Sequence, residues 1–194
     1  MPESWETLGR REVARARVFT LHEVRTRAPH TGEEHDFYVI EAGDWCNVVA
    51  ITDADELVCV RQYRHGVERT TLEIPGGIID AGETPEQAAA RELLEETGYE
   101  AERVVYVGAV DSNPVILTNR THTCVALGLH PKVAAQALDA TEDIEVVLVP
   151  LAEMPAHMLA GDFSHALAVA ALYLVEVWRG RNQDDEGPGG EDLV

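Results

Sequence analysis

The chain has 194 residues, of which 45% are apolar and 26% are charged, a composition typical of one folded globular domain with an extension. Its 35 acidic residues outnumber its 15 basic residues, and the formal net charge of −20 disfavours binding to nucleic acid or to anionic membrane surfaces. The same charge is compatible with a phosphate-bearing small molecule only if cations accompany it.

Neither a membrane helix nor a secretion signal is evident. No run approaches the ~18 apolar residues of a membrane helix, and the acidic N-terminus lacks an apolar stretch of the signal-peptide type. We therefore expect a cytoplasmic protein. Cys46, Cys59 and Cys124 lie in apolar, strand-like runs without metal-binding spacing, which predicts buried free thiols.

The first segment, residues 1–42, is interpreted as an N-terminal β-hairpin extension. Strand-like runs at 18–24 and 37–40 are joined through the turn-forming Pro29-His30-Thr31-Gly32. The segment therefore lies outside the main domain.

The main domain is predicted over residues 43–181. It begins with two runs rich in Val and Ile, at 46–52 and 57–63, separated by the turn-forming Asp53-Ala54-Asp55. We expect these runs to pair as a hairpin in the main sheet.

A short strand at 71–74 leads through a glycine-containing loop to one predicted helix, from Pro85 to Thr97. Thr84 is its expected N-cap, and Gly98 is expected to end it. Alanine and leucine side chains on one side of this helix suit packing on a sheet, whereas acidic residues line another side.

In the later part of the chain, strands and helices do not alternate regularly. We predict strands at 104–110, 121–127 and 144–149, and helices at 151–159 and 164–179. This order indicates an α/β (α+β) fold with a mixed sheet. Residues 182–194 are rich in Asp, Glu, Gly and Pro and predict a disordered acidic tail.

Three carboxylates are expected on one face of the first helix, because Glu92, Glu95 and Glu96 are three and four residues apart. Like charges so placed repel unless a cation lies among them, and Mg²⁺ prefers oxygen ligands. Taken alone, a Glu-rich helix is more often a solvated surface. Arg91 is expected to pair with Glu83 or Glu95 and to hold the loop against the helix.

The segment from Gly77 to Tyr99 resembles the signature of the Nudix hydrolase family: Gly, five residues, Glu, seven residues, then Arg-Glu-apolar-any-Glu-Glu-any-Gly-apolar. Every other specified position is met, and only Tyr99 departs, an aromatic where an aliphatic residue is usual. The matching residues are Gly77, Glu83, Arg91, Glu92, Leu93, Glu95, Glu96 and Gly98. The order of elements from about residue 42 to 151 also resembles the family's mixed sheet between helices.

The resemblance implies hydrolysis of a nucleoside diphosphate linked to another group. It implies that Glu92, Glu95 and Glu96 hold Mg²⁺, or Mn²⁺, with the backbone carbonyl of Gly76 as a further ligand. Glu83 and Arg91 would brace this site.

Two runs, Arg61-Gln62-Tyr63-Arg64-His65 and Leu72-Glu73-Ile74-Pro75-Gly76-Gly77, are similar to the ADP-ribose and nucleotide-sugar pyrophosphatase branch of the family. A proline about fifteen residues beyond the signature is a further marker of the branch, and Pro114 stands at that place. The substrate-binding residues that this likeness implies are Arg61, Arg64, Glu73, Pro114 and Arg120. The alternative for the three arginines is a solvated surface position.

The branch also supplies an acidic residue from a loop between late strands, and Glu142 fits that place best. Glu142 is thus a candidate metal ligand, general base, or both. Because Ala140 replaces another acidic residue sometimes found there, the base stays open between Glu95 and Glu142.

The branch further implies a homodimer that exchanges the N-terminal hairpin. The favoured function is hydrolysis of a nucleoside diphosphate sugar, ADP-ribose or similar, to a nucleoside monophosphate and a sugar phosphate. The alternatives are a catalytically silent Nudix domain that senses a nucleotide, which the intact glutamates disfavour, and a Nudix hydrolase of dinucleoside polyphosphates or capped RNA, which the charge disfavours. The preferred sugar nucleotide stays open.

Overall fold

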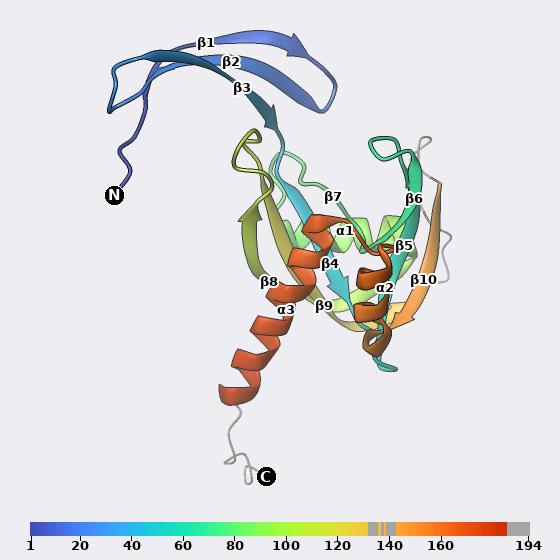
Figure 1. The fold of residues 1–194 in the computed structure, drawn as a ribbon. Coiled ribbons are helices and arrows are strands. Elements are labelled where there is room, and N and C mark those ends of the chain that lie inside the picture. Colours follow the sequence, from blue (N-terminus) through green and yellow to red (C-terminus); the bar gives the residue numbers. More distant parts are fainter. Residues whose placement is uncertain (132–135, 137, 139–142, 186–194) are drawn as a thin grey trace. The chain divides into compact units, whose positions relative to one another are not determined.

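The computed structural model describes residues 1–131, 136, 138 and 143–185. The chain divides into two compact units (Figure 1). The first comprises Met1–Asp44 and Asp111–Arg120, and the second comprises Trp45–Val110 and Thr121–Val194. None of the helices in the described part of the chain is long and apolar enough to cross a membrane.

The first unit is an antiparallel sheet of three strands in the order β1 (Glu6–Arg15), β2 (Phe19–Arg27) and β3 (Glu34–Ala42). The predicted hairpin corresponds to β2 and β3, and β1 was missed. Its sequence alternates poorly because charged residues fill it, and these are partnered across the sheet, as in the Arg11–Glu23 ion pair at 2.9 Å. Pairing with β2 therefore stabilises a strand that has no apolar pattern of its own.

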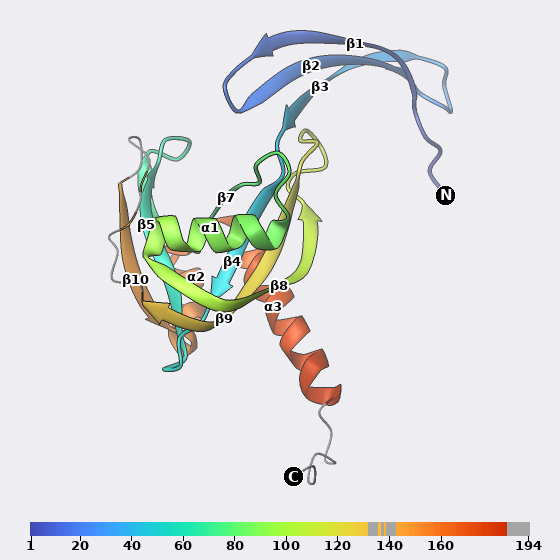
Figure 2. The same cartoon turned by 180° about the vertical axis from the view of Figure 1, so that it is seen from behind.

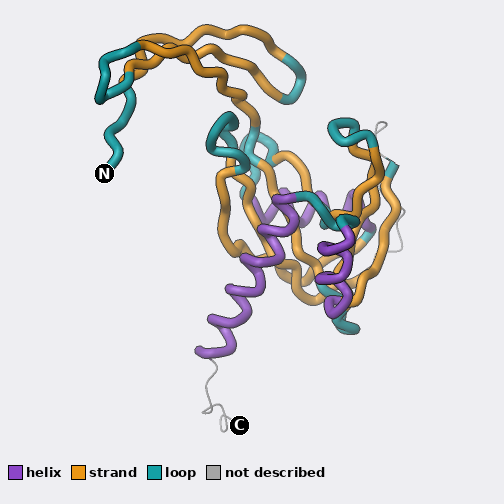
Figure 3. Tube along the Cα trace, viewed as in Figure 1, coloured by secondary structure: helices purple, strands orange, loops and turns teal. Residues whose placement is uncertain are grey.

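The second unit contains two sheets together with the helices of the described chain (Figure 3). One sheet has the order β7 (Gly76–Ile78), β4 (Trp45–Ala50), β9 (Arg120–Pro131) and β8 (Tyr99–Asp111). The other has the order β10 (Ile144–Pro150), β5 (Glu56–Arg64) and β6 (Arg69–Glu73). Strands β4 and β9 run parallel while β4 and β7 run antiparallel, so the predicted mixed sheet is confirmed.

The predicted pairing of residues 46–52 with 57–63 is wrong. These runs form β4 and β5, which lie in different sheets and meet only near their connecting turn, through a bridge between Ile51 and Leu57 and a hydrogen bond from the Thr52 amide to the Glu56 carbonyl at 2.9 Å. Strand β4 and the first half of β5 are buried on both faces, as central strands are. Such a pattern identifies a buried strand but does not specify its neighbours, which for β4 are β7 and β9.

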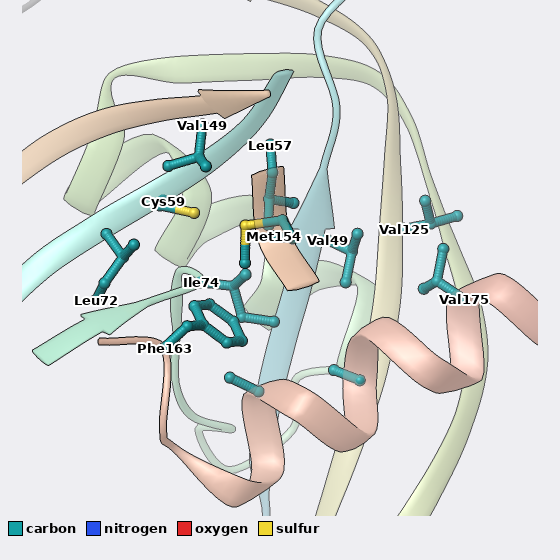
Figure 4. Packing of buried hydrophobic residues seen from close by; sticks show 12 residues of the cluster. Val49, Leu57, Cys59, Leu72, Ile74, Val125, Val149, Met154, Phe163 and Val175 are labelled. Atoms are coloured by element: carbon teal, nitrogen blue, oxygen red, sulfur yellow. The ribbon is translucent and has the colours of Figure 1, made fainter. Parts of the chain in front are cut away.

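The helices cover opposite faces of β4, as Figures 1 and 2 show. Because side chains alternate along a strand, Cys46, Val48 and Ala50 point to one face and pack with α1 (Pro85–Thr97). Val49 points to the other face, where α2 (Met154–Ala160) and α3 (Ala166–Asp185) complete the core (Figure 4). A short 3-10 turn, Leu151–Glu153, precedes α2. The three cysteines are free and buried, as predicted.

Helix α1 has the predicted bounds because both of its ends are capped. Thr84 Oγ1 accepts a hydrogen bond from the Gln87 amide, and Gln87 Oε1 accepts one from the Thr84 amide. Gly98 ends the helix with a φ of 73°, a left-handed conformation that favours glycine. Helix α3 extends past the predicted end at Arg179, and residues 186–194 of the predicted tail lie outside the described residues.

We expect Thr84→Ala to lower the free energy of unfolding by about 1 kcal/mol, because the substitution removes the side-chain acceptor at the start of α1. Urea denaturation measures this change. Thr84→Ser keeps the acceptor and should unfold close to wild type. Equal stability of Thr84→Ala and wild type would show that the cap contributes nothing measurable.

Candidate active site

Two adjacent glycines bring the backbone of β7 against α1. Gly76 pairs with Asn47 of β4, and Gly77 pairs with Cys46. A Cβ on Gly76 would collide with the Cys46 carbonyl, and a Cβ on Gly77 would collide with the Glu92 carboxylate. A side chain at position 76 would displace the backbone of β4, whereas one at position 77 would displace the Glu92 carboxylate.

Arg91 connects the loop, β7 and the acidic face of α1. Its Nε and Nη2 donate to the two carboxylate oxygens of Glu83, each at 3.0 Å. Its Nη1 donates to Glu92 at 2.7 Å and to Glu95 at 3.1 Å, and Nη2 also donates to the Ile78 carbonyl at 3.0 Å. Both partners predicted for Arg91, Glu83 and Glu95, are therefore present.

The hydrogen bonds of this network shift the pKa values of Glu83 and Arg91. The hydrogen bonds from Arg91 hold the pKa of the Glu83 carboxyl below its usual range, and the Asp80 amide adds to the effect. The hydrogen bonds to Glu83 raise the pKa of the Arg91 guanidinium further above its already high value. Arg91 therefore stays charged and Glu83 stays ionised, which fixes the loop to the helix.

The three helix glutamates differ in surroundings. Glu96 is buried, with 4% of its surface exposed, and its Oε2 accepts a hydrogen bond from the Gly76 amide at 3.0 Å. The side chain of Glu92 is mostly covered, whereas that of Glu95 is 40% exposed. Glu95 is thus the most accessible of the three carboxylates.

The carboxylates of this helix face bond to different partners. Within the described residues, no three His, Cys, Asp or Glu side chains stand close enough together to hold a metal ion. The physical reason is that Arg91 attracts Glu92 and Glu95 while the Gly76 amide attracts Glu96.

Two of the predicted substrate-binding residues contact each other. Arg64 donates from Nε and Nη2 to the two carboxylate oxygens of Glu73, at 2.9 and 3.0 Å. Glu73 is only 2% exposed and also accepts from Thr71 at 2.6 Å, with His165 Nδ1 at 3.1 Å. Burial alone raises the pKa of the Glu73 carboxyl, but the hydrogen bonds from His165, Arg64 and Thr71 outweigh it and hold the pKa well below the usual range.

The other predicted substrate-binding residues are dispersed. Arg61 forms an exposed ion pair with Glu145 at 2.9 Å. Pro114 lies in an exposed turn of the first unit. Arg120, in the same unit, has its Nε 3.6 Å from Oδ1 of Asp111. That Arg61, Pro114 and Arg120 contact the substrate stays a prediction. Glu142 lies outside the described residues.

Three polar residues in this region were missed by the sequence analysis. Asn47 joins β4 to α3 through a hydrogen bond to the Leu167 carbonyl at 3.1 Å. Gln136 donates to the carbonyls of Glu96 and Ile144, which ties the end of α1 to the start of β10. His165 contacts Glu73. Each contact joins residues that are far apart in the sequence, so no local sequence pattern predicts it.

Comparison with known proteins identifies the family. The model of the NUDIX domain matches residues 46–172. A methanol dehydrogenase activator from Bacillus methanolicus is 39% identical over 106 residues, which span 55% of this chain and 57% of that protein. An ADP-ribose pyrophosphatase from Bacillus subtilis (strain 168) is 31% identical over 146 residues, or 75% of this chain and 78% of that protein.

A solved structure agrees with this comparison. The crystal structure of an ADP compounds hydrolase superimposes with a TM-score of 0.81 and 30% identity, covering 93% of this chain and 97% of that one. Since the NUDIX model covers well over half of this chain and includes the whole segment from Gly76 to Gly98, the chain belongs to the Nudix hydrolase family.

Proposed function

We propose that the protein hydrolyses the pyrophosphate bond of a nucleoside diphosphate sugar of the ADP-ribose type, with Mg²⁺ as its metal. The products are a nucleoside monophosphate and a sugar phosphate. The observation that carries the proposal is the arrangement of four glutamates around Arg91 and the Gly76 amide.

The charge of this arrangement supports a metal site. The carboxylates of Glu83, Glu92 and Glu95 pair with one guanidinium, so three negative charges meet one positive charge, and Glu96 of the same helix is bonded only to a neutral amide among the contacts described above. Uncompensated carboxylates on one helix face are unfavourable, and hard divalent cations are suited to oxygen ligands. The donor set therefore fits Mg²⁺, and Mn²⁺ is the alternative.

The proposed ligands are Glu92, Glu95 and Glu96, with the Gly76 carbonyl as a further candidate. When bound, the metal neutralises pyrophosphate oxygens and lowers the pKa of a bound water. Arg91 and Glu83 hold β7, the loop and α1 in one arrangement, so the backbone that carries the ligands is fixed in place. Binding a metal requires Glu92 and Glu95 to share their oxygens with it or to turn from Arg91.

The general base is proposed to be Glu95 or Glu142. A base must reach the proton that it removes, and the greater exposure of Glu95 within the helix cluster supports it. Glu142 is the second candidate, because its loop resembles the one that supplies an acidic residue in the ADP-ribose branch of the family.

The substrate class is supported by the names of the relatives, one an ADP-ribose pyrophosphatase and another an ADP compounds hydrolase. Arg61 and Arg64 are proposed to contact the substrate, because planar guanidinium donors suit phosphate oxygens. Glu73 is buried among its own partners, which favours a role in orienting Arg64 over direct recognition of a base or ribose.

We also propose a homodimer in which the first unit contacts a second copy. Its sheet carries exposed aromatic side chains, and Trp5 packs edge-on to Phe37 with ring centroids 5.6 Å apart. Grouped apolar side chains on a surface mark interaction sites. The cytoplasmic location stays a prediction from the sequence.

We expect Glu96→Gln to lower kcat by about 100-fold or more, because the neutral amide is a poor metal ligand. Its oxygen still accepts from the Gly76 amide, so the fold should be retained. Glu86→Gln, on the first turn of the same helix, is the control and should keep full activity. A Mg²⁺-dependent rate equal to wild type in Glu96→Gln would refute the metal assignment.

We expect Gly77→Ala to raise the Mg²⁺ concentration for half-maximal activity by about 10-fold or more, because the added methyl group displaces the Glu92 carboxylate. A titration of activity with Mg²⁺ measures this shift. Gly108→Ala is the matched control, since its Cβ would meet no atom within 4 Å. An unchanged Mg²⁺ requirement in Gly77→Ala would argue against Glu92 as a ligand.

We expect Phe37→Glu to convert a dimer to a monomer and to reduce activity, because it places a charge on the proposed contact surface. Sedimentation velocity gives the oligomeric state. Tyr173→Glu alters an exposed aromatic on α3 and should leave the dimer intact. A monomeric wild-type protein, or a fully active monomer of Phe37→Glu, would contradict the proposed exchange.

A further inference from the structure

A cavity of about 260 Å³ opens between the ends of β5 and β6 and the connection from α2 to α3. All of its lining residues belong to the second unit. Its polar lining consists of Arg64, Arg69, Thr71, Glu73, Ser164 and His165.

The acidic member of this lining is already neutralised. Glu73 is buried and bonds both of its oxygens to Arg64, and Thr71 and His165 complete its shell. A buried carboxylate with this many donors is satisfied and has little capacity to attract a further cation. The Arg64–Glu73 pair therefore contributes no net charge to the cavity.

The second arginine has no such compensation. Arg69 donates from Nη2 to Ser164 Oγ at 2.9 Å and from Nη1 to the Gly161 carbonyl at 3.4 Å, and both acceptors are neutral. Across the described ranges, no carboxylate forms an ion pair with it, in contrast to Arg61, Arg64 and Arg91. Arg64 and Arg69 against Glu73 leave the lining of the cavity with one net positive charge, in a chain of net charge −20.

The start of α3 adds to this preference. Ala166 is the first residue of this 20-residue helix and lines the cavity beside His165. The amides and the positive end of the dipole at a helix N-terminus favour an anion. Two guanidinium groups, an imidazole and a helix start thus meet at one cavity.

We propose that this cavity binds a phosphate group, held chiefly by Arg69 with Arg64 and His165. Several fixed N–H donors around a positive site suit a tetrahedral anion with many acceptor oxygens. The cavity lies close to α1 along the chain, because three residues from Glu73 to Gly76 span at most about 10 Å. The group comes either from the substrate or from free phosphate, and the chemistry of binding is the same.

The test titrates the full chain with inorganic phosphate in EDTA, so that no metal contributes, and follows heat or the ³¹P signal. Wild type should bind saturably with a Kd below about 10 mM, and Arg69→Gln should weaken binding by about 10-fold or more. Arg69→Lys keeps the charge and should bind with intermediate affinity. Arg103→Gln, an exposed arginine on β8, should bind as wild type does.

Two results would overturn the proposal: no saturable binding by wild type, or equal binding by Arg69→Gln with its far-UV circular dichroism unchanged. Because no turnover is measured, these results do not depend on the proposed hydrolysis, which can fail separately. Steady-state kinetics then distinguish the source. If the substrate supplies the phosphate, Arg69→Gln raises KM and phosphate competes with substrate. If free phosphate is the ligand, KM is unchanged and inhibition is not competitive.

Discussion

The site depends on one guanidinium that holds several carboxylates of like charge in place. Arg91 bonds to Glu83 of the loop, to Glu92 and Glu95 of its own helix, and to the carbonyl of Ile78 at the end of β7. Without Arg91, the carboxylates on the acidic face of α1 would repel one another, and the loop would lose its hydrogen bonds to the helix. A bidentate arginine gives both charge compensation and a fixed geometry, which lysine does not. The proposed metal chemistry rests on this arrangement.

The arrangement is possible because α1 is held from two sides. Its apolar residues pack on one face of β4, while the glycines of β7 let the backbone approach its acidic face. The other face of β4 packs against α3, which also contributes the start of its helix to the cavity around Arg69. The same short stretch of chain, from Glu73 to Gly77, therefore serves both the core and the polar surface next to it.

Local chemistry explains what the sequence could predict. The bounds of α1 follow from Thr84 and Gly98, and the partners of Arg91 follow from helical spacing and the loop length. The pairing of β4 with β9 could not be predicted from the sequence, because a strand that is apolar on both faces has no sequence pattern that specifies its neighbours. Strand β1 was missed because its stability comes from cross-strand ion pairs rather than from apolar alternation. The His165 contact with Glu73 was missed because only the tertiary fold joins α3 to β6.

The central claim is that the carboxylates around Arg91 hold a metal that supports cleavage of a pyrophosphate bond. The most direct measurement is incubation of the purified protein with ADP-ribose, followed by chromatographic identification of the products with Mg²⁺ and with EDTA. We expect AMP and ribose 5-phosphate in equal amounts with Mg²⁺, and intact ADP-ribose with EDTA. Cleavage at the same rate in EDTA, or products that leave the pyrophosphate bond intact, would contradict the claim.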